Sequence, residues 1–294
     1  MNTSKIKLLS AMGIFGTIGI FVRFIPLSSA AIAFTRGALG VLFLLGTMAI
    51  GRKKFDLKTI KENLSLLCCS GIAIGFNWIL LFESYKHTTV ATATICYYLA
   101  PFFLLMLSPQ LGEKLTFKKI SCIVVALVGM VFVSGVLDGP TPEISEWKGI
   151  IMGIDAAILY ASVMFMNKKL PPMAANDKTL LQLGSSTVVL LPYLLLTEGA
   201  SVPTLKTYQW LLLLCVGILH TGFAYAIYFD AIKKLPAKTV AIFSYLDPVL
   251  AIILSSVILK EQLTTFGVIG SVLILASALY SELPSKADKT SDAP

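Results

Sequence analysis

Four ionisable residues stand deep inside long apolar stretches of this 294-residue sequence: Arg36, Asp155, His220 and Asp247. Moving a charged group from water into an apolar span is costly, so each of the four is a candidate for binding or proton transfer. Charged residues near the ends of such stretches, for example Arg23, can reach water and are weaker candidates.

Arg36 and Asp155 carry opposite charges in different apolar stretches. The guanidinium can grip a substrate carboxylate through two parallel hydrogen bonds, or it can hold its own helix through a salt bridge or backbone carbonyls. Asp155 can receive a cationic group of a substrate, or it can form a structural pair with Arg36 at similar depth. The sequence leaves both alternatives open for each residue.

His220 and Asp247 are the candidates for carrying a proton. Histidine titrates near neutral pH, which suits a proton carrier, but a histidine can also be hydrogen-bonded inside a packed bundle. Asp247 precedes Pro248, whose ring removes one backbone hydrogen bond and frees a carbonyl. A carboxylate beside such a break can bind a substrate amine or a proton.

Aromatic and amide side chains gather in the same stretches. Tyrosine and tryptophan away from the membrane interface need a polar partner, so they can line a polar cavity. Such a cavity suits zwitterions and, through cation–π contact, flat cations. Helix packing and interface anchoring are the alternative for each residue. The candidates for substrate binding are Asn77, Trp78, Tyr98, Tyr225 and Tyr245, with Tyr97, Tyr160 and Tyr228 in the same group.

The elements that must position these residues are membrane spans. The chain is 56% hydrophobic and 14% charged, with a mean hydropathy of +0.83, whereas a soluble domain is about 25% charged. A helix needs about 20 apolar residues to cross the hydrocarbon core. We therefore expect an all-α polytopic membrane protein with ten transmembrane helices, near residues 6–23, 28–50, 64–84, 89–109, 118–136, 148–168, 178–197, 208–231, 236–259 and 265–281.

One segment of the sequence occurs twice. Residues 92–101 read TATICYYLAP and residues 239–248 read TVAIFSYLDP, so Thr, Ile, Tyr, Leu and Pro recur at the same places. Each copy has a proline in the middle of its span, and we expect Pro101 and Pro248 to act as kinks or hinges. The first copy has alanine where the second has Asp247, so the fold of the repeat does not require that acid.

The repeat predicts two five-helix units, residues 1–140 and 141–283, followed by a disordered polar tail at 284–294. Five spans are an odd number, so the second unit enters the membrane inverted relative to the first, as in many transporters. With a cytoplasmic N-terminus, 18 of the 24 lysines and arginines lie on the inner side and 5 on the outer side. This bias predicts a multi-pass protein of the plasma (inner) membrane with both termini in the cytoplasm.

These features resemble the drug/metabolite transporter (DMT) superfamily, specifically its ten-helix EamA-like members. The likeness rests on the spans, the repeat, Thr35-Arg36-Gly37, the two Tyr-Leu-x-Pro segments, and Gly-Glu-Lys-Leu at 112–115 with Lys-Glu-Gln-Leu at 260–263. The resemblance covers about residues 6–136 and 148–281. It implies that the first four helices of each unit surround a central cavity, with the fifth outside. It also implies a cargo of amino acids, other metabolites, drugs or nucleotide sugars, many exported and some exchanged for protons.

Other kinds of chemistry lack their sequence signatures. There is no GxxxxGK[ST] loop, so ATP-driven pumping by this chain is not expected. The five cysteines have no metal-type spacing and the two histidines make no catalytic set, so we expect no metal, no cofactor and no enzyme activity. The net charge of +8 is spread between apolar runs and is not the clustered patch that nucleic acid requires.

We therefore expect a secondary transporter that exports a small organic metabolite, such as an amino acid or a drug, by alternating access. Proton exchange and facilitated diffusion are both compatible with the sequence. The alternatives are an importer or translocator of a nucleotide- or lipid-linked precursor and, more distantly, a membrane-embedded enzyme. The expected partners are the substrate, the lipid bilayer and protons, and the sequence leaves monomer and homodimer open.

Overall fold

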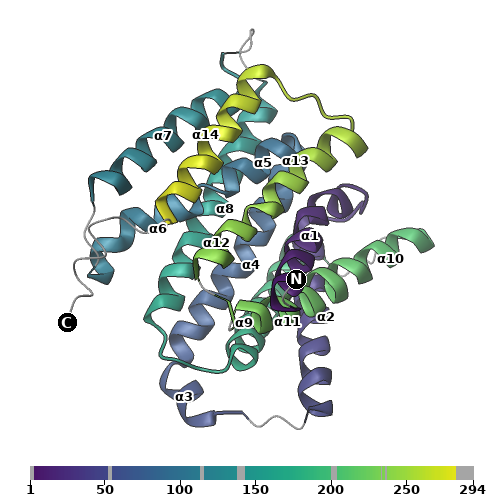
Figure 1. Cartoon of the computed structure of the whole chain (residues 1–294). Helices are drawn as coiled ribbons and strands as arrows, with labels where there is room; N and C mark the ends of the chain where they lie inside the picture. The colour runs from purple at the N-terminus through teal and green to yellow at the C-terminus, as the bar shows by residue number, and fades with distance from the viewer. Residues whose placement is uncertain are drawn as a thin grey trace, which may run out of the picture.

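The computed structural model of the chain describes residues 3–51, 55–112, 116–137, 143–199, 204–232, 234–235 and 237–282. Every regular element in these ranges is a helix, which confirms the predicted all-α class (Figure 1). Seven helices in the described part of the chain are long and apolar enough to cross a membrane, and shorter apolar helices cover Ile242–Ile258 and Thr265–Ser281. The count of ten spans therefore stays a prediction.

The helices begin and end close to the predicted boundaries. In the first half they are α1 (Thr3–Arg23), α2 (Ser29–Ile50), α3 (Leu57–Glu62), α4 (Leu64–His87), α5 (Val90–Tyr97), α6 (Ala100–Leu107) with the 3₁₀ turn η1 (Ser108–Leu111), and α7 (Phe117–Val133). In the second half they are α8 (Ile144–Lys169), α9 (Ala175–Glu198), α10 (Thr207–Leu214), the π-helix η2 (Cys215–Phe223), α11 (Ala224–Ile232), α12 (Ala237–Ser244), α13 (Leu246–Ile258) and α14 (Thr265–Glu282). The short helix α3 lies where only a loop was expected. The predicted tail at 284–294 and residues 113–115 of the first Gly-Glu-Lys-Leu motif lie outside the described residues.

Side-chain caps set several of the helix starts. The hydroxyls of Ser28, Thr89 and Thr116 accept the backbone N–H of the third residue that follows them, at the starts of α2, α5 and α7. Asp56 caps α3 in the same way through the N–H of Thr59. Each cap satisfies one of the N–H groups that a helix start leaves without a partner.

The two proline-containing spans are broken beside the repeated segment. Helix α5 ends at Tyr97 and helix α12 ends at Ser244. Pro101 and Pro248 lie four residues further along, and a proline has no N–H to offer the carbonyl four residues before it. Each helix therefore ends at the residue whose carbonyl the proline leaves free. The breaks stand where kinks were expected, although their use as hinges stays a prediction.

A π-helix, η2, interrupts the span between Thr207 and Ile232, and the sequence patterns did not indicate it. Two side chains support this wider turn by bonding to carbonyls five residues earlier. His220 Nδ1 lies 3.1 Å from the Cys215 oxygen, and the Thr221 hydroxyl donates to the Val216 oxygen at 2.9 Å. The π-helix therefore presents two adjacent polar side chains inside the bundle.

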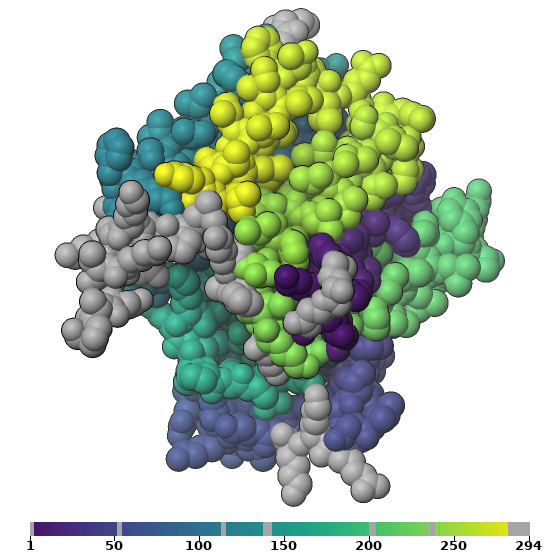
Figure 2. All heavy atoms as spheres, viewed as in Figure 1, coloured from purple at the N-terminus to yellow at the C-terminus, as the bar shows by residue number. Residues whose placement is uncertain are grey.

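The helix pairs repeat between the two halves. Helix α4 of the first half packs on α8 and α9 of the second half. Its counterpart in the second half, the span that contains η2 and α11, packs on α2 and α1 of the first half. Helix α2 also packs on α9, and α7 packs on α14 at one edge of the molecule (Figure 1). Helices α12 and α13 both pack on α1, and α12 also contacts α14, so the segment that they form bridges the two parts of the face seen in Figure 2. Exchanged pairs of this kind are what an inverted repeat produces.

Small residues allow the backbones to approach closely where helices cross. A Cβ added to Gly270 in α14 would lie 2.5 Å from the Gly129 oxygen in α7, and one added to Gly71 in α4 would lie 2.3 Å from the Gln182 oxygen in α9. Membrane helices associate through such close van der Waals contacts because lipid is as apolar as their side chains. The crossings of α7 with α14 and of α4 with α9 therefore depend on glycine.

Gly270→Ala should destabilise the α7–α14 pair, because the new methyl group meets backbone that cannot move aside. We expect a loss of about 1–3 kcal/mol, the usual cost of overpacking, measured as a lower temperature of unfolding in detergent. Gly46→Ala is the control, since nothing lies within 4 Å of a Cβ at that position in α2. The control should keep or raise stability, because alanine favours a helix over glycine. Equal unfolding temperatures for the two variants would contradict this account of the crossing.

Candidate functional site

Arg36 in α2 is buried, with 4% of its surface exposed. Its guanidinium carbon lies 4.0 Å above the Trp78 ring and 5.5 Å from the Phe82 ring, both in α4. Its Nε donates to the Thr221 hydroxyl in η2 at 3.0 Å. The positive charge is therefore held by two aromatic faces and one hydroxyl, and it links α2 to both α4 and η2.

No described carboxylate lies within ion-pair distance of Arg36, so the structural pair with Asp155, one of the two alternatives that the sequence left open, does not form in this structure. The two terminal nitrogens of the guanidinium make no hydrogen bond to a described residue. Neither nitrogen is a fully buried polar atom that lacks a partner, so both keep some contact with solvent. Arg36 thus offers the pair of parallel donors that a carboxylate accepts best.

Asp247 stands at the break between α12 and α13 and is half-buried. The hydroxyl of Tyr98, from the corresponding break in the first half, donates to its Oδ2 at 2.9 Å. The same hydroxyl lies 3.4 Å from the Ser244 carbonyl that Pro248 leaves free. The two helix breaks therefore meet through one tyrosine, and Asp247 makes no ion pair with any described residue.

Tyrosine rings lie beside each of these two charges. Next to Arg36, the Phe82 ring stacks on the Tyr85 ring with centroids 6.3 Å apart. Next to Asp247, Tyr98 and Tyr245, which occupy matching places in the repeat, have ring centroids 6.2 Å apart. The site therefore has a cationic end and an anionic end, each flanked by aromatic rings.

Further rings extend this aromatic group. Tyr97 stacks on Tyr160 of α8 with ring centroids 5.2 Å apart. Tyr225 makes an edge contact with Phe15 of α1 at 5.4 Å. Helices from both halves of the chain thus contribute rings, which gives the site apolar faces beside its two charges.

His220 is completely buried and both ring nitrogens have partners. Nδ1 lies 3.1 Å from the Cys215 carbonyl, and because a carbonyl only accepts, Nδ1 carries a hydrogen. Nε2 lies 2.8 Å from the Thr17 hydroxyl of α1, and that hydroxyl also lies 2.7 Å from the Ile14 carbonyl.

The single hydroxyl hydrogen of Thr17 allows two proton arrangements. Donated to Nε2, it leaves His220 neutral. Donated to the Ile14 carbonyl, it requires Nε2 to carry its own hydrogen and the ring to be charged. The arrangement can hold a proton or release it without a change of partners.

The remaining predicted residues have different surroundings. Asn77 is buried and donates to the Ala156 carbonyl of α8 at 2.5 Å, so its amide holds α4 to α8. Trp78 lies under Arg36 and is part of the site. Asp155 lies on an exposed face of α8 with Ile151 and Ile158, away from the charged pair. The structure brings Asn77 and Asp155 into no contact with the two site charges.

Two functional partners were absent from the sequence-based set: Thr221, which accepts from Arg36, and Thr17, which contacts His220. A threonine within an apolar run is a weak signal, because its hydroxyl can satisfy itself on the carbonyl of its own helix. Thr221 could have been suspected from its position next to His220. Nothing in the sequence alone pairs Thr17 with a residue about 200 positions away.

The EamA-like transporter family matches this chain over residues 4–135 and 147–282, which together make up most of its length. The chain belongs to the EamA-like transporter family. It is thus a polytopic membrane protein of the DMT superfamily, as its resemblance and its apolar helices predicted. The two matched ranges also leave out the segment between the halves.

Individual relatives agree with this membership. An uncharacterized transporter YxxF of Bacillus subtilis (strain 168) is 31% identical over 94% of this chain and 88% of its own length. A probable amino-acid metabolite efflux pump of Salmonella typhimurium is 29% identical over 74% of this chain and 76% of its own. A solved crystal structure, at 15% identity, matches with a TM-score of 0.65 over the full length of both chains, which shows a shared fold.

Thr221→Val should destabilise this EamA-like protein because it removes the acceptor of the buried Arg36 Nε–H. A lost hydrogen bond to a charged group costs about 1.5–3 kcal/mol, which thermal unfolding in detergent would measure. Thr187→Val in α9 is the matched control, since the Thr187 hydroxyl donates to a carbonyl of its own helix. If both variants lose the same free energy of unfolding, the hydrogen bond from Arg36 to Thr221 adds nothing beyond the loss of an ordinary hydroxyl–carbonyl bond.

Proposed function

We propose that this EamA-like protein is a secondary transporter that exports a small amphoteric metabolite, an amino acid or a related compound, across the plasma membrane. Arg36 binds the substrate carboxylate and Asp247 binds its amine, while the aromatic rings receive its side chain. The substrate moves by alternating access, either in exchange for protons or down its own gradient. The observation that carries the proposal is the presence of two opposite charges inside the bundle, each beside aromatic rings and each without an ion-pair partner among the described residues.

Physical reasoning supports this pairing of site and substrate. An unpaired charge in a low-dielectric interior is costly, so a site with a guanidinium and a separate carboxylate gains most from a ligand that carries both complementary charges. A zwitterion arrives with its own charges balanced and leaves the site electrically unchanged. The name of the Salmonella relative, an amino-acid metabolite efflux pump, points in the same direction.

Substrate analogues test the two binding roles separately. In proteoliposomes, the parent should prefer an amino acid over both its decarboxylated amine and its N-acetyl derivative. Arg36→Gln should abolish the preference over the amine, and Asp247→Asn should abolish the preference over the N-acetyl derivative. Each loss should be about tenfold or more, because each removes a hydrogen bond between charged groups.

Asp155→Asn is the control for this experiment, since it neutralises an aspartate of another span without touching the charged pair. It should keep both preferences. The binding roles are wrong if Arg36→Gln and Asp247→Asn lower the flux of all three compounds equally, because the two side chains would then matter only for folding or packing.

Proton coupling is tested by flux with and without a pH gradient. If export uses proton exchange, an inward proton gradient should speed export by the parent, and Asp247→Asn or His220→Gln should remove that acceleration. Flux down the substrate gradient should persist in at least one of the two variants. A parent that ignores the gradient transports by facilitated diffusion, and neither residue then carries a coupled proton.

A further inference from the structure

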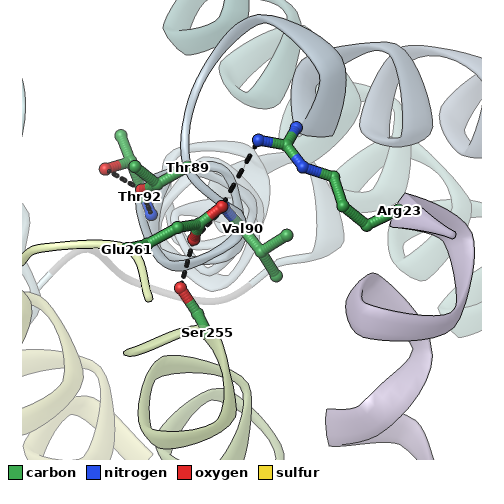
Figure 3. Close-up of polar contacts among 6 residues, drawn as sticks. All are labelled: Arg23, Thr89, Val90, Thr92, Ser255 and Glu261. Atoms are coloured by element: carbon green, nitrogen blue, oxygen red, sulfur yellow. Dashed lines mark hydrogen bonds and ion pairs between the residues drawn. The ribbon is translucent and has the colours of Figure 1, made fainter. Parts of the chain in front are cut away.

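Glu261 joins three elements of the bundle at one end (Figure 3). Its Oε2 accepts the Val90 N–H at the start of α5 at 2.9 Å and also the hydroxyl of Ser255 in α13. Its Oε1 lies 3.4 Å from Nη2 of Arg23, the last residue of α1. The predicted topology places this end of the bundle outside the cell, and we call it the outer end.

The contacts of Glu261 connect the two halves of the chain. Val90 and Arg23 belong to the first half, whereas Glu261 and Ser255 belong to the second. The Glu261 side chain is only 10% exposed, so its hydrogen bonds are little weakened by water. The N-terminus of α5 also attracts a negative charge through its free N–H groups. A single carboxylate therefore closes the space between α1, α5 and α13 at the outer end.

The backbone beside Glu261 turns sharply at the end of α13. Lys260 has a φ of 59°, and it is the only residue other than glycine with a positive φ in the described part of the chain. A residue in this conformation commonly ends a helix, usually as glycine because a Cβ is less favourable there. Here it turns the chain back after α13, and the Glu261 N–H bonds to the Ser255 carbonyl at 3.3 Å. The turn directs the carboxylate toward α5.

The opposite end of the same two spans differs in the residues that the structure describes. At the outer end α5 packs against α13, whereas the described residues of α6 and α12 form no comparable contact. Ser108, which begins η1 directly after α6, is the repeat equivalent of Ser255, and its buried hydroxyl has no partner among the described residues. The two equivalent serines are therefore bonded at the outer end and unbonded at the inner end, while Glu113, the repeat equivalent of Glu261, lies outside the described residues.

We propose that Glu261 is the outer latch of the transport cycle, and that this structure is the state closed to the outside. In an inverted repeat, opening one side and closing the other exchanges the conformations of the two halves. The latch must therefore break before substrate can leave outward: Glu261 releases the Val90 N–H, Ser255 and Arg23, and α5 separates from α13.

Chemical labelling reports whether the latch is closed. Thr94 lies one turn inside Val90 on the same face of α5 and is 5% exposed. In a full-length chain whose five cysteines are replaced, Thr94→Cys should react slowly with a membrane-impermeant maleimide added outside intact cells. Adding Glu261→Gln should raise the labelling rate about tenfold, because the loss of charged hydrogen bonds favours the open state.

Val90→Pro is a second way to weaken the latch. It removes the N–H that Glu261 accepts and replaces one buried apolar side chain by another, and proline suits the first position of a helix. The preceding Thr89 has φ −68° and ψ 151°, an extended geometry that is compatible with a following proline. Labelling should rise as it does for Glu261→Gln. Glu198→Gln, which neutralises an exposed glutamate at the end of α9 that is also predicted to be outside, should leave labelling unchanged.

The proposal fails if Glu261→Gln and Val90→Pro both leave labelling within twofold of the parent, or if Glu198→Gln raises it equally.

If neither latch variant reaches the membrane, the double variant Arg23→Cys with Glu261→Cys decides. Cross-linking it with a short reducible reagent should stop transport, and reduction should restore it; full transport while cross-linked overturns the latch. Labelling needs no substrate, so an error in the proposed substrate would leave this result intact.

Discussion

A positive charge without a counter-ion in the middle of the bundle is the constraint on which the rest of this structure depends. Arg36 rests on the Trp78 ring and donates to Thr221, but it has no described carboxylate beside it. Aromatic faces and a hydroxyl stabilise a buried guanidinium less than a carboxylate partner would stabilise it. The folded protein therefore keeps a guanidinium without an anionic partner among the described residues, and this is the group that we propose binds the substrate carboxylate.

The repeated proline supplies the second half of the site. A proline in a span frees one carbonyl and ends the hydrogen-bonded helix before it, which gives polar backbone at membrane depth. Such backbone is tolerated only where side chains or a polar space cover it. Tyr98 reaches across from the first half to the break in the second, where it meets both the Ser244 carbonyl and Asp247. The two breaks thus meet inside the bundle, and only the second of them carries an acid, since the first has Ala100 where the second has Asp247.

The two ends of the bundle differ although the repeat relates them. Ser255 donates to Glu261, whereas the buried hydroxyl of the equivalent Ser108 has no partner among the described residues. Glu261 also accepts the Val90 N–H of the first half, directly after the turn at Lys260. In our proposal these contacts keep the outer end closed and must break before cargo is released.

The sequence by itself determined the helices, their approximate ends, the internal repeat and the family, because hydropathy, proline and glycine act locally along the chain. It also identified Arg36, His220 and Asp247 as ionisable groups whose placement inside an apolar span costs free energy, and therefore as candidates for function. Only the tertiary structure decided their partners. Of the two alternatives for Asp155, the pair with Arg36 does not form, since Asp155 lies on an exposed face of α8. The contacts of Thr17, Thr221 and Glu261 depend on which helices cross and how they rotate. Those choices follow from packing among distant segments that no local pattern encodes.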